Sequence, residues 1–372
     1  MSIRVLQVIP TLVRGGAEKQ LSLLATGLPR DEFDVHVGVL TSDGPYHQTL
    51  DDHEIPVTLI DKRWKVDPAA HFRLCKCIRG LRPDIVHTWI FAANCYGRQA
   101  AITSGVKHII AGERCVDRWK VWHELAIDRY LARRTEKIVT NSSGVREFYV
   151  ARGIPVEKFA VIPNGIAPFQ GSAMLNRAEL LQQLGLASNS RLVGAIGRLW
   201  PQKRYKDLIF AFELLAAARD DVELLIVGTG PQRDQLMTYR NQMTYGDRIH
   251  LLGPRDDIPQ LLAHLDCFWL GSAYEGQSNA MMEALSAGLP VVATDIAGNR
   301  DLIENGDTGF LVPVGDCGEF ARKTNQMFED HELAKRLGEA GRDRMLIEFS
   351  VDKMIQRHAA LYRELLGIAA RP

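Results

Sequence analysis

Residues 272–309 read SAYEGQSNAMMEALSAGLPVVATDIAGNRDLIENGDTG and carry three structural signals in close succession. The polar residues EGQSN lead into the apolar run 280–285, which predicts a loop entering a helix, with Ser278 or Asn279 as the N-cap. Gly288 is placed to end that helix, and the following LPVVAT is typical of a short buried strand. The stretch therefore predicts a helix–strand unit of an α/β protein.

Two glutamates, Glu275 and Glu283, stand on either side of this predicted helix start. A helix N-terminus presents unpaired N–H groups and a partial positive charge, which suit an anion, and Gly276 lets such a ligand approach the backbone. The two carboxylates can accept hydrogen bonds from hydroxyls at both ends of the ligand. An anion flanked by hydroxyls describes a nucleotide-sugar. The alternative is that both glutamates only compensate the helix dipole, with an effect of about a few tenths of a kcal/mol each.

The pattern EGxxNAxxEAxxxGxPVVAT formed by these residues resembles the E-x7-E region of the retaining glycosyltransferases of family 4, also called glycosyl transferases group 1. The resemblance implies an α/β protein of the GT-B fold, in which two Rossmann-like doubly wound domains face a central cleft. It also implies a nucleoside-diphosphate sugar as co-substrate, bound without a metal ion or another cofactor.

Length and composition agree with a globular protein of two domains. The chain has 372 residues, enough for two domains of ~150–200 residues each, with 46% apolar and 24% charged residues. Lys plus Arg and Asp plus Glu both number 45, so net charge gives no argument for a nucleic-acid partner. The six cysteines lack the paired spacing of a metal site and are expected to be reduced.

Two further observations predict the cellular compartment of the protein. No apolar run reaches the ~18 residues needed to span a bilayer. The first residues, MSIRVL, lead directly into a strand and lack the pattern of a signal peptide. We therefore expect a cytoplasmic protein.

Short apolar runs alternate with helical patterns along both halves of the chain, as in doubly wound parallel sheets. Strands of the first half are predicted at residues 3–9, 35–40, 57–60, 85–86, 106–111, 138–140 and 159–162. Strands of the second half are predicted at residues 191–196, 223–227, 249–252, 267–270 and 289–294. The two series predict two domains of the same architecture.

Domain boundaries follow from the segment between the two series. We predict an acceptor-binding domain over residues 1–167 and a nucleotide-sugar-binding domain over residues 190–351, joined by the linker 167–189. Two terminal helices are predicted, the first over residues 317–349. The second, about residues 352–372, carries an apolar stripe and is expected to pack back on the first domain.

The first strand is followed by a glycine turn, Gly15-Gly16, and a helical pattern. The spacing is not that of the dinucleotide motif, and the segment GGAE resembles the N-terminal glycine loop of the family. Gly16 is therefore a candidate donor-binding residue, although a Gly-Gly pair is also an ordinary turn.

Three candidate acceptor-side residues follow predicted strands of the first half. His87 comes at the end of one strand, where ligands of parallel sheets bind, although a structural histidine is equally compatible. Arg114 stands where many relatives carry a nearby histidine, and it either contacts a phosphate or pairs with Glu113. Asn164 belongs to an IPNG turn that resembles that of the family, or is a plain tight turn.

Trp119 and Trp122 lie in a basic segment. The cations are Arg118, Lys120, Arg129, Arg133, Arg134 and Lys137. A basic and aromatic helical face can lie on an anionic membrane surface, here the inner one. The alternative is a solvated helix whose two tryptophans pack inward.

Arg198 and Lys203 follow the first strand of the second half and match the GRxxxxK segment of the family. Two cations and helix-terminal amides can neutralise the roughly two negative charges of a diphosphate. The resemblance implies Arg198, Lys203 and Glu275 as catalytic residues. Donor-binding residues would be Gly16, Gly276, Gln277, Ser278, Asn279 and Glu283.

The predicted function is retaining transfer of a hexosyl unit from a nucleoside-diphosphate sugar to a glycan or lipid-linked acceptor. Cell-surface polysaccharide or glycolipid synthesis is the expected setting. Two alternatives stay open, a nucleotide-sugar epimerase of the same fold and a non-catalytic nucleotide-sugar-binding protein. The sequence leaves the base, the sugar, the linkage and the acceptor undetermined.

Overall fold

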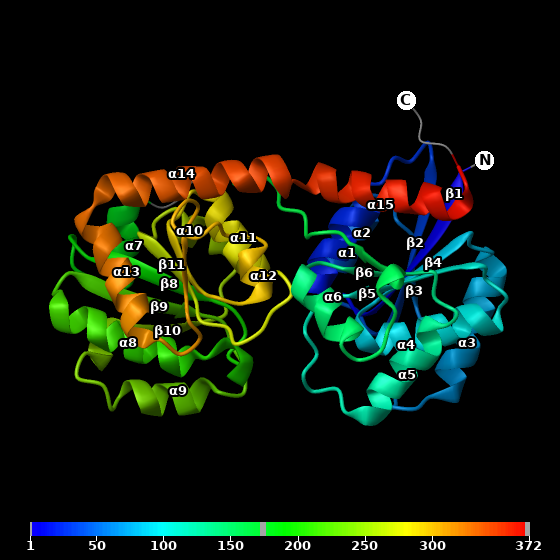
Figure 1. The fold of residues 1–372 in the computed structure, drawn as a ribbon, viewed down its shortest axis with the longest axis horizontal. Helices are drawn as coiled ribbons and strands as arrows, with labels where there is room; N and C mark the ends of the chain where they lie inside the picture. The colour runs from blue at the N-terminus through cyan, green and yellow to red at the C-terminus, as the bar shows by residue number, and fades with distance from the viewer. Residues whose placement is uncertain (1, 172–175, 369–372) are drawn as a thin grey trace. The chain divides into compact units, whose positions relative to one another are not determined.

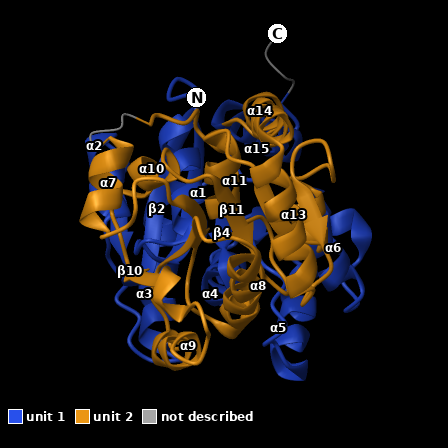
Figure 2. Cartoon of the chain, turned by 90° about the vertical axis from the view of Figure 1, so that its left-hand side faces the viewer, with its two compact units in different colours: residues 1–165, 351–372 blue, residues 166–350 orange. Residues whose placement is uncertain are grey.

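Every apolar run predicted as a strand lies in or overlaps a parallel strand of the computed structural model, which describes residues 2–171 and 176–368. Residues 172–175 of the predicted linker and 369–372 of the predicted last helix lie outside the described residues. The chain divides into two compact units, residues 1–165 with 351–372 and residues 166–350 (Figure 2).

Within the described residues of the first unit, seven parallel strands form one sheet in the order β3-β2-β1-β4-β5-β6-β7. The strands are β1 (Ile3–Thr11), β2 (Phe33–Ser42), β3 (Val57–Leu59), β4 (Ile85–Trp89), β5 (His108–Glu113), β6 (Lys137–Thr140) and β7 (Phe159–Val161). The order reverses between β1 and β4, and this switch point is where parallel sheets form ligand sites beyond their carboxyl ends.

Helices cover both faces of this sheet (Figure 1). They are α1 (Gly16–Gly27), α2 (Tyr46–Asp52), α3 (Pro68–Leu81), α4 (Ile90–Thr103), α5 (Trp122–Ala132), α6 (Ser143–Val150), the 3-10 helix η1 (Val156–Lys158) and α15 (Val351–Leu366). Leu24 of α1 and Tyr362 of α15 belong to the core on one face, and Leu74 of α3 to the core on the other. Alternate residues of β1 serve the two cores because successive side chains of a strand point to opposite faces.

The second unit contains a six-stranded parallel sheet within its described residues, in the order β10-β9-β8-β11-β12-β13. The strands are β8 (Arg191–Ile196), β9 (Val222–Val227), β10 (Ile249–Gly253), β11 (Cys267–Leu270), β12 (Val291–Thr294) and β13 (Phe310–Val312). The helices are α7 (Arg177–Gln183), η2 (Pro201–Lys203), α8 (Tyr205–Ala218), α9 (Arg233–Arg240), η3 (Gly246–Arg248), α10 (Ile258–Leu262), α11 (Asn279–Ser286), α12 (Ala297–Arg300), α13 (Cys317–Glu329) and α14 (His331–Glu348). The predicted α/β class with two doubly wound sheets is confirmed.

The last helix, α15, packs within the first unit. Its buried residues Ile355, Ala359 and Tyr362 contribute to the core that α1 also covers. Arg363 of α15 donates two hydrogen bonds, from Nε and Nη2, to the two carboxylate oxygens of Glu32, both at 2.6 Å. A bidentate pair of this kind adds a directional contact to the apolar packing.

The single helix predicted over residues 317–349 is wrong, because the chain breaks it at Asp330. That residue has an extended backbone, and its carboxylate accepts a hydrogen bond from Leu333 N–H at 2.9 Å, so it is the N-cap of α14.

Candidate functional site

An ion pair between Lys203 and Glu275 is the centre of the candidate site in the second unit. Lys203 ends η2, which follows β8, and Glu275 lies in the loop between β11 and α11. The Lys203 Nζ lies 2.5 Å from Glu275 Oε1, and only 14% and 10% of the two side chains are exposed. Ser272 Oγ donates to the same carboxylate oxygen at 2.8 Å, so the carboxylate has a defined orientation.

The loop that carries Glu275 is tied to η2 by two further hydrogen bonds. Ala273 N–H donates to the Gln202 carbonyl at 2.9 Å, and Gln202 Nε2 donates to the Tyr274 carbonyl at 2.8 Å. Tyr205 lies beneath, and burial together with the charge of Glu275 raises the pKa of its hydroxyl well above its usual value. The ion pair is therefore supported from several sides, as a preorganised charge requires.

Glycines allow the loops at the carboxyl edge of this sheet to approach one another. A Cβ on Gly298, in α12, would lie 1.8 Å from the carbonyl oxygen of Gly276. A Cβ on Gly228, after β9, would lie 2.0 Å from the carbonyl oxygen of Gly197, after β8. Gly228 has φ +137°, a value that favours glycine. A side chain at Gly298 would displace the loop that holds Glu275, and a side chain at Gly228 would displace the segment that leads from β8 to Lys203.

Helix α11 begins as the sequence predicts. Of the two predicted N-caps the structure selects Ser278, whose side chain accepts a hydrogen bond from Met281 N–H at 3.4 Å. Asn279 is then the first helical residue, and Glu283 lies about one turn inside. The loop residues Gly276 and Gln277 are buried directly before the cap. The predicted donor-binding residues of this stretch thus share one helix start next to Glu275.

Arg198 is placed differently from Lys203. Its guanidinium is exposed and lies over the ring of Trp200, 5.6 Å from the centroid. Among the residues that the structure describes, no hydrogen bond or ion pair joins Arg198 to Lys203 or Glu275. The structure therefore brings two of the three predicted catalytic residues together, and a joint role of both cations stays a prediction.

The three candidate acceptor-side residues gather in the interior of the first unit. An Nη2 hydrogen of Arg114 is donated to Asn164 Oδ1, and the Arg114 guanidinium lies 4.9 Å from the ring centroid of Trp89. His87 is fully buried, and its Nδ1 lies 2.8 Å from the hydroxyl of Tyr362. The same hydroxyl accepts a hydrogen bond from Gln7 Nε2 at 2.9 Å. The three residues form one cluster, and their contact with an acceptor stays a prediction.

Burial dominates the ionisation of this cluster. It lowers the pKa of Arg114 to about 9, and it lowers the pKa of His358, with the Arg114 charge nearby, to about 3. Burial also lowers the pKa of His87 well below its usual value, and the charges of His358 and Arg114 act in the same direction. Both histidines are therefore neutral at physiological pH.

Gly16 begins α1, the first helix of the same unit. The carboxylate of Glu18 folds back over Gly15, where a Cβ would lie 2.1 Å from Oε2. Thr11 Oγ1 donates to Glu18 Oε1 at 2.9 Å. The predicted glycine turn thus has a local structural use, and contact between Gly16 and a donor stays a prediction.

A buried ion network around Lys120 was missed by sequence reasoning. Lys120 was assigned to a basic surface face, and this is wrong. Its Nζ is buried at 3.3 Å from Glu113, 3.2 Å from Asp117 and 2.9 Å from Asp128. Arg98 also pairs with Asp128, at 2.8 Å. Burial raises the pKa of Glu113 to about 7 even though Lys120 opposes the shift. In the sequence, the only sign of this buried network is the alternation of acidic and basic residues over residues 113–128.

The two tryptophans of that segment are also placed differently from the inward-packed alternative. Trp119 is 55% exposed and Trp122 is 78% exposed. Trp119 meets the ring of Phe91 edge-on, with centroids 5.1 Å apart. The interpretation that both tryptophans pack into the core is therefore wrong.

Over residues 2–171 and 176–368, no group of three or more His, Cys, Asp or Glu side chains is arranged to hold a metal ion. Within those same ranges, every helix is either too short or too polar to cross a bilayer.

Comparison with known families assigns both units. The family model described as Glycosyltransferase Family 4 matches residues 14–168, and the model described as Glycosyl transferases group 1 matches residues 176–344. The two matches cover every described strand of both sheets except β1, and all the candidate residues named above.

Individual relatives agree with this assignment. The chain is 29% identical, over 91% of each chain, to the UDP-Gal:alpha-D-GlcNAc-diphosphoundecaprenol alpha-1,3-galactosyltransferase of Escherichia coli. It is 30% identical to a GDP-mannose-dependent alpha-mannosyltransferase of Mycobacterium tuberculosis, over 66% of this chain and 64% of the relative. The structure of Anabaena HepE in complex with UDP-glucose matches 97% of this chain and 100% of its own, at 25% identity and a TM-score of 0.87. The chain belongs to the glycosyltransferases of family 4 and group 1, has their GT-B fold, and is a glycosyltransferase.

Proposed function

We propose that the enzyme transfers a hexosyl unit from a nucleoside-diphosphate sugar to a lipid-linked or glycan acceptor, with retention at the anomeric carbon. The observation that carries this proposal is the buried Lys203–Glu275 pair beside the start of α11. A cation next to helix-terminal amides suits a departing diphosphate, and a fixed carboxylate suits the positive charge that develops on the sugar.

The residues have separate roles in this scheme. Lys203 stabilises the diphosphate as the bond to the sugar breaks, and Arg198 adds a second positive charge once its exposed side chain turns from Trp200. Glu275, oriented by Ser272, accepts hydrogen bonds from sugar hydroxyls. Glu283, one turn inside α11, accepts from the ribose. With two cations and the α11 amides the scheme needs no metal ion.

The relatives support a choice of substrates. The E. coli relative uses UDP-galactose with a diphosphoundecaprenol acceptor, and Anabaena HepE was solved with UDP-glucose. The Mycobacterium relative depends on GDP-mannose. We propose a UDP-hexose as donor and a lipid diphosphate-linked sugar as acceptor, on the cytoplasmic side of the membrane, in polysaccharide or glycolipid synthesis.

A donor panel followed by a transfer assay tests the function. UDP-galactose, UDP-glucose, UDP-N-acetylglucosamine and GDP-mannose are compared by thermal shift, since a ligand at 100 Kd stabilises by about 2.7 kcal/mol. The stabilising donor is then incubated with a lipid diphosphate-linked sugar, and the anomeric configuration of the product is read by NMR. We expect an α-linked product from an α-linked donor.

Two results would contradict the proposal. Conversion of the donor to another sugar nucleotide without any acceptor would indicate an epimerase. Donor binding with neither transfer nor slow hydrolysis of the donor would indicate a non-catalytic binding protein. Glu275→Gln serves as the control, because it keeps the shape of the loop and removes the charge; transfer that is unchanged in this variant rejects the site.

A further inference from the structure

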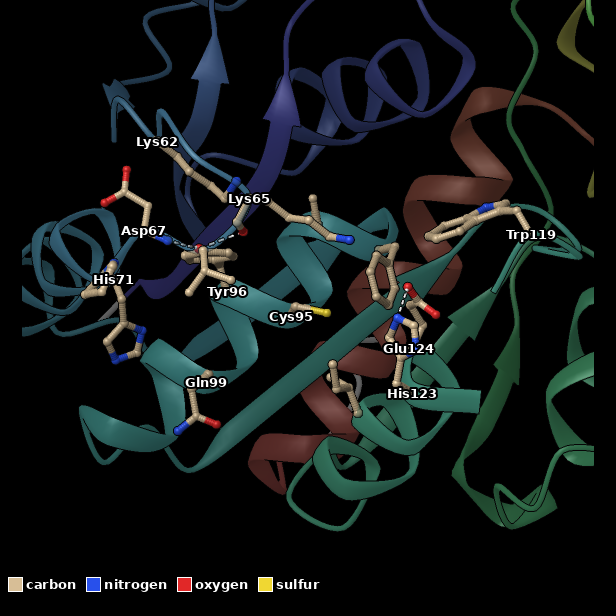
Figure 3. Close-up of a pocket in the computed structure, with 15 residues that line it drawn as sticks. Lys62, Lys65, Asp67, His71, Cys95, Tyr96, Gln99, Trp119, His123 and Glu124 are labelled. Carbon is tan, nitrogen blue, oxygen red and sulfur yellow. Dashed lines mark hydrogen bonds and ion pairs between the residues drawn. The ribbon is translucent and has the colours of Figure 1, made fainter. Parts of the chain in front are cut away.

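A cavity of about 560 Å³ opens in the first unit (Figure 3), and its lining includes none of His87, Arg114 and Asn164. Its walls come from the segment 62–71, from α4 and from residues 119–127. These segments follow the carboxyl ends of β3, β4 and β5 respectively. The cavity therefore belongs to the edge of the sheet at which parallel α/β folds bind their ligands.

The walls of the cavity are mainly apolar. Val66, Pro68, Phe91, Trp119 and Ile127 line it. Cys95 also faces it, and burial raises the pKa of that thiol to about 12, so it stays a neutral thiol. A sugar or a free nucleotide needs polar partners over most of its surface, and these walls offer few. Their chemistry suits a hydrocarbon chain.

Large apolar side chains continue from the cavity onto the surface. Trp64 and Val66, on the segment that forms one wall, are 66% and 79% exposed. Val121 and Trp122, on the segment that forms the other, are 50% and 78% exposed. Exposed apolar residues are ordinary when scattered, but each of these four either lines the cavity or lies within two residues in sequence of one that does, and a group of this kind marks a binding surface.

Two lysines, Lys62 and Lys65, also line the cavity and come from a different wall from Trp119 and His123 (Figure 3). Lys62 Nζ donates to the Trp64 carbonyl at 2.6 Å and lies 4.9 Å from the ring centroid of Tyr96. Within the described parts of the chain, neither Lys62 nor Lys65 forms an ion pair with a carboxylate. Two lysines without carboxylate partners, next to an apolar cavity, are complementary to a phosphate that carries a hydrocarbon chain.

The two acidic residues of the lining do not cancel this charge, because both are engaged elsewhere. Asp67 accepts hydrogen bonds from the N–H groups of Arg63 and Ala70, both at 2.9 Å. Glu124 pairs with His123 at 2.7 Å and accepts from Val121 N–H at 3.1 Å. Both carboxylates keep their charge but already have partners of their own, whereas the two lysine ammonium groups have no carboxylate partner among the described residues and are available to an anion.

We propose that this cavity holds the hydrocarbon chain of the lipid-linked acceptor next to its phosphate, with Lys62 and Lys65 facing the phosphate. The inference rests on the proposed function for the identity of the acceptor, and it places the lipid part in the first unit. An unlinked glycan would leave the apolar walls without a partner.

Binding of a short-chain, water-soluble polyprenyl phosphate tests the inference without any donor. We expect the full-length enzyme to bind it at least tenfold more tightly than inorganic phosphate, with a change in tryptophan fluorescence. Ile127→Glu, Lys65→Glu and the milder Trp119→Ser should each weaken binding at least tenfold. Val156→Glu, at a 58% exposed apolar residue of η1, and Lys107→Glu are matched controls and should bind as the wild type does.

Kinetics with the lipid-linked acceptor give a second readout. The KM for that acceptor should rise at least tenfold in the cavity variants, with kcat nearly unchanged at saturation. Equal affinity in variants and controls overturns the proposal, as does equal affinity for phosphate with and without a chain. It also falls if the variants lose only binding to anionic vesicles, because the surface is then a membrane contact. Lipid binding that follows the variants in an enzyme without transferase activity would reject the proposed function alone.

Discussion

The Lys203 ammonium and the Glu275 carboxylate lie 2.5 Å apart and join η2 to the loop before α11. The two residues belong to segments that follow β8 and β11, which are neighbours in the sheet. A largely buried pair of this kind contributes little net stability, but removal of one partner leaves an uncompensated charge. The pair therefore has separable consequences for folding and for catalysis.

Lys203→Met should lower transfer at least about 100-fold, the loss expected when one charge-stabilising group is removed. The free energy of unfolding should fall by roughly 3–5 kcal/mol because Glu275 is left buried without its partner. The double variant Lys203→Met with Glu275→Gln should recover most of the stability and none of the activity. Urea unfolding and initial rates of transfer measure both quantities.

Arg322→Met is the control for that series. Arg322 pairs with Glu319 on the surface of α13, where solvent screens such pairs, so stability and transfer should both stay near wild type. A Lys203→Met enzyme as active as this control would remove Lys203 from the reaction.

Gly298→Ala should disrupt donor binding. Its Cβ would fall 1.8 Å from the Gly276 carbonyl oxygen, so the loop that carries Glu275 has to move. We expect the Kd for UDP, measured by calorimetry, to rise at least tenfold. Gly80→Ala is the matched change in α3, where a Cβ meets open space, and there a gain of about 0.5–1 kcal/mol with unchanged UDP binding is expected. Equal UDP affinity in both variants would mean that the loop can shift without loss.

Lys120→Met should destabilise the first unit by roughly 3–5 kcal/mol, because Glu113 would be left as a buried carboxylate without its cation and Asp128 would keep only Arg98. Chemical unfolding monitored by circular dichroism measures the loss. Lys107→Met changes an exposed lysine of the same unit and should stay within about 0.5 kcal/mol of wild type. A stable Lys120→Met protein would show that the acids bind protons at little cost.

The His358→Asn variant should lose less stability than the wild type when the pH is lowered. The folded-state pKa of His358 is about 3, below its usual value, so the unfolded chain binds a proton that the native state does not. Stability is therefore lost as the pH falls below 6.5, by roughly 1.5 kcal/mol between pH 6.5 and 5. An asparagine side chain cannot take up that proton, and the variant should lose correspondingly less stability over this range.

Other titratable groups in the first unit also make stability depend on pH, so the His358→Asn variant has to be compared with the wild type at each pH. His87 and Arg114 face His358, and the lowered pKa of His87 adds acid sensitivity of the same sign. Glu113, with a pKa raised to about 7, acts in the opposite sense, since its contribution is present at low pH and lost as the pH rises through 7. The free energy of unfolding of the wild type and of the variant is measured with urea at each pH. The contributions of His87 and Glu113 then cancel in the difference between the two proteins. Parallel pH profiles would contradict the assignment.

Local signals were enough for much of the fold. Strands, the Ser278 cap and the end of α11 before Gly288 depend on residues within a few positions of one another, and the structure agrees with each. The break at Asp330 was missed because the apolar periodicity continues across it, although the capping acid is itself local. The same kind of local pattern is the basis for the prediction of a ligand site around Glu275.

By itself the amino-acid sequence determined the α/β class, the two series of strands, the helix start at Ser278 and the family to which the chain belongs. Only the tertiary structure decided that Lys203 meets Glu275, that Arg114 meets Asn164, and that Lys120 is buried among acids. It also decided that Trp119 lines an open cavity instead of packing inward. The physical reason is that propensity and capping act between near neighbours in the chain, whereas these contacts depend on strand order and on which side chains the packing excludes from water.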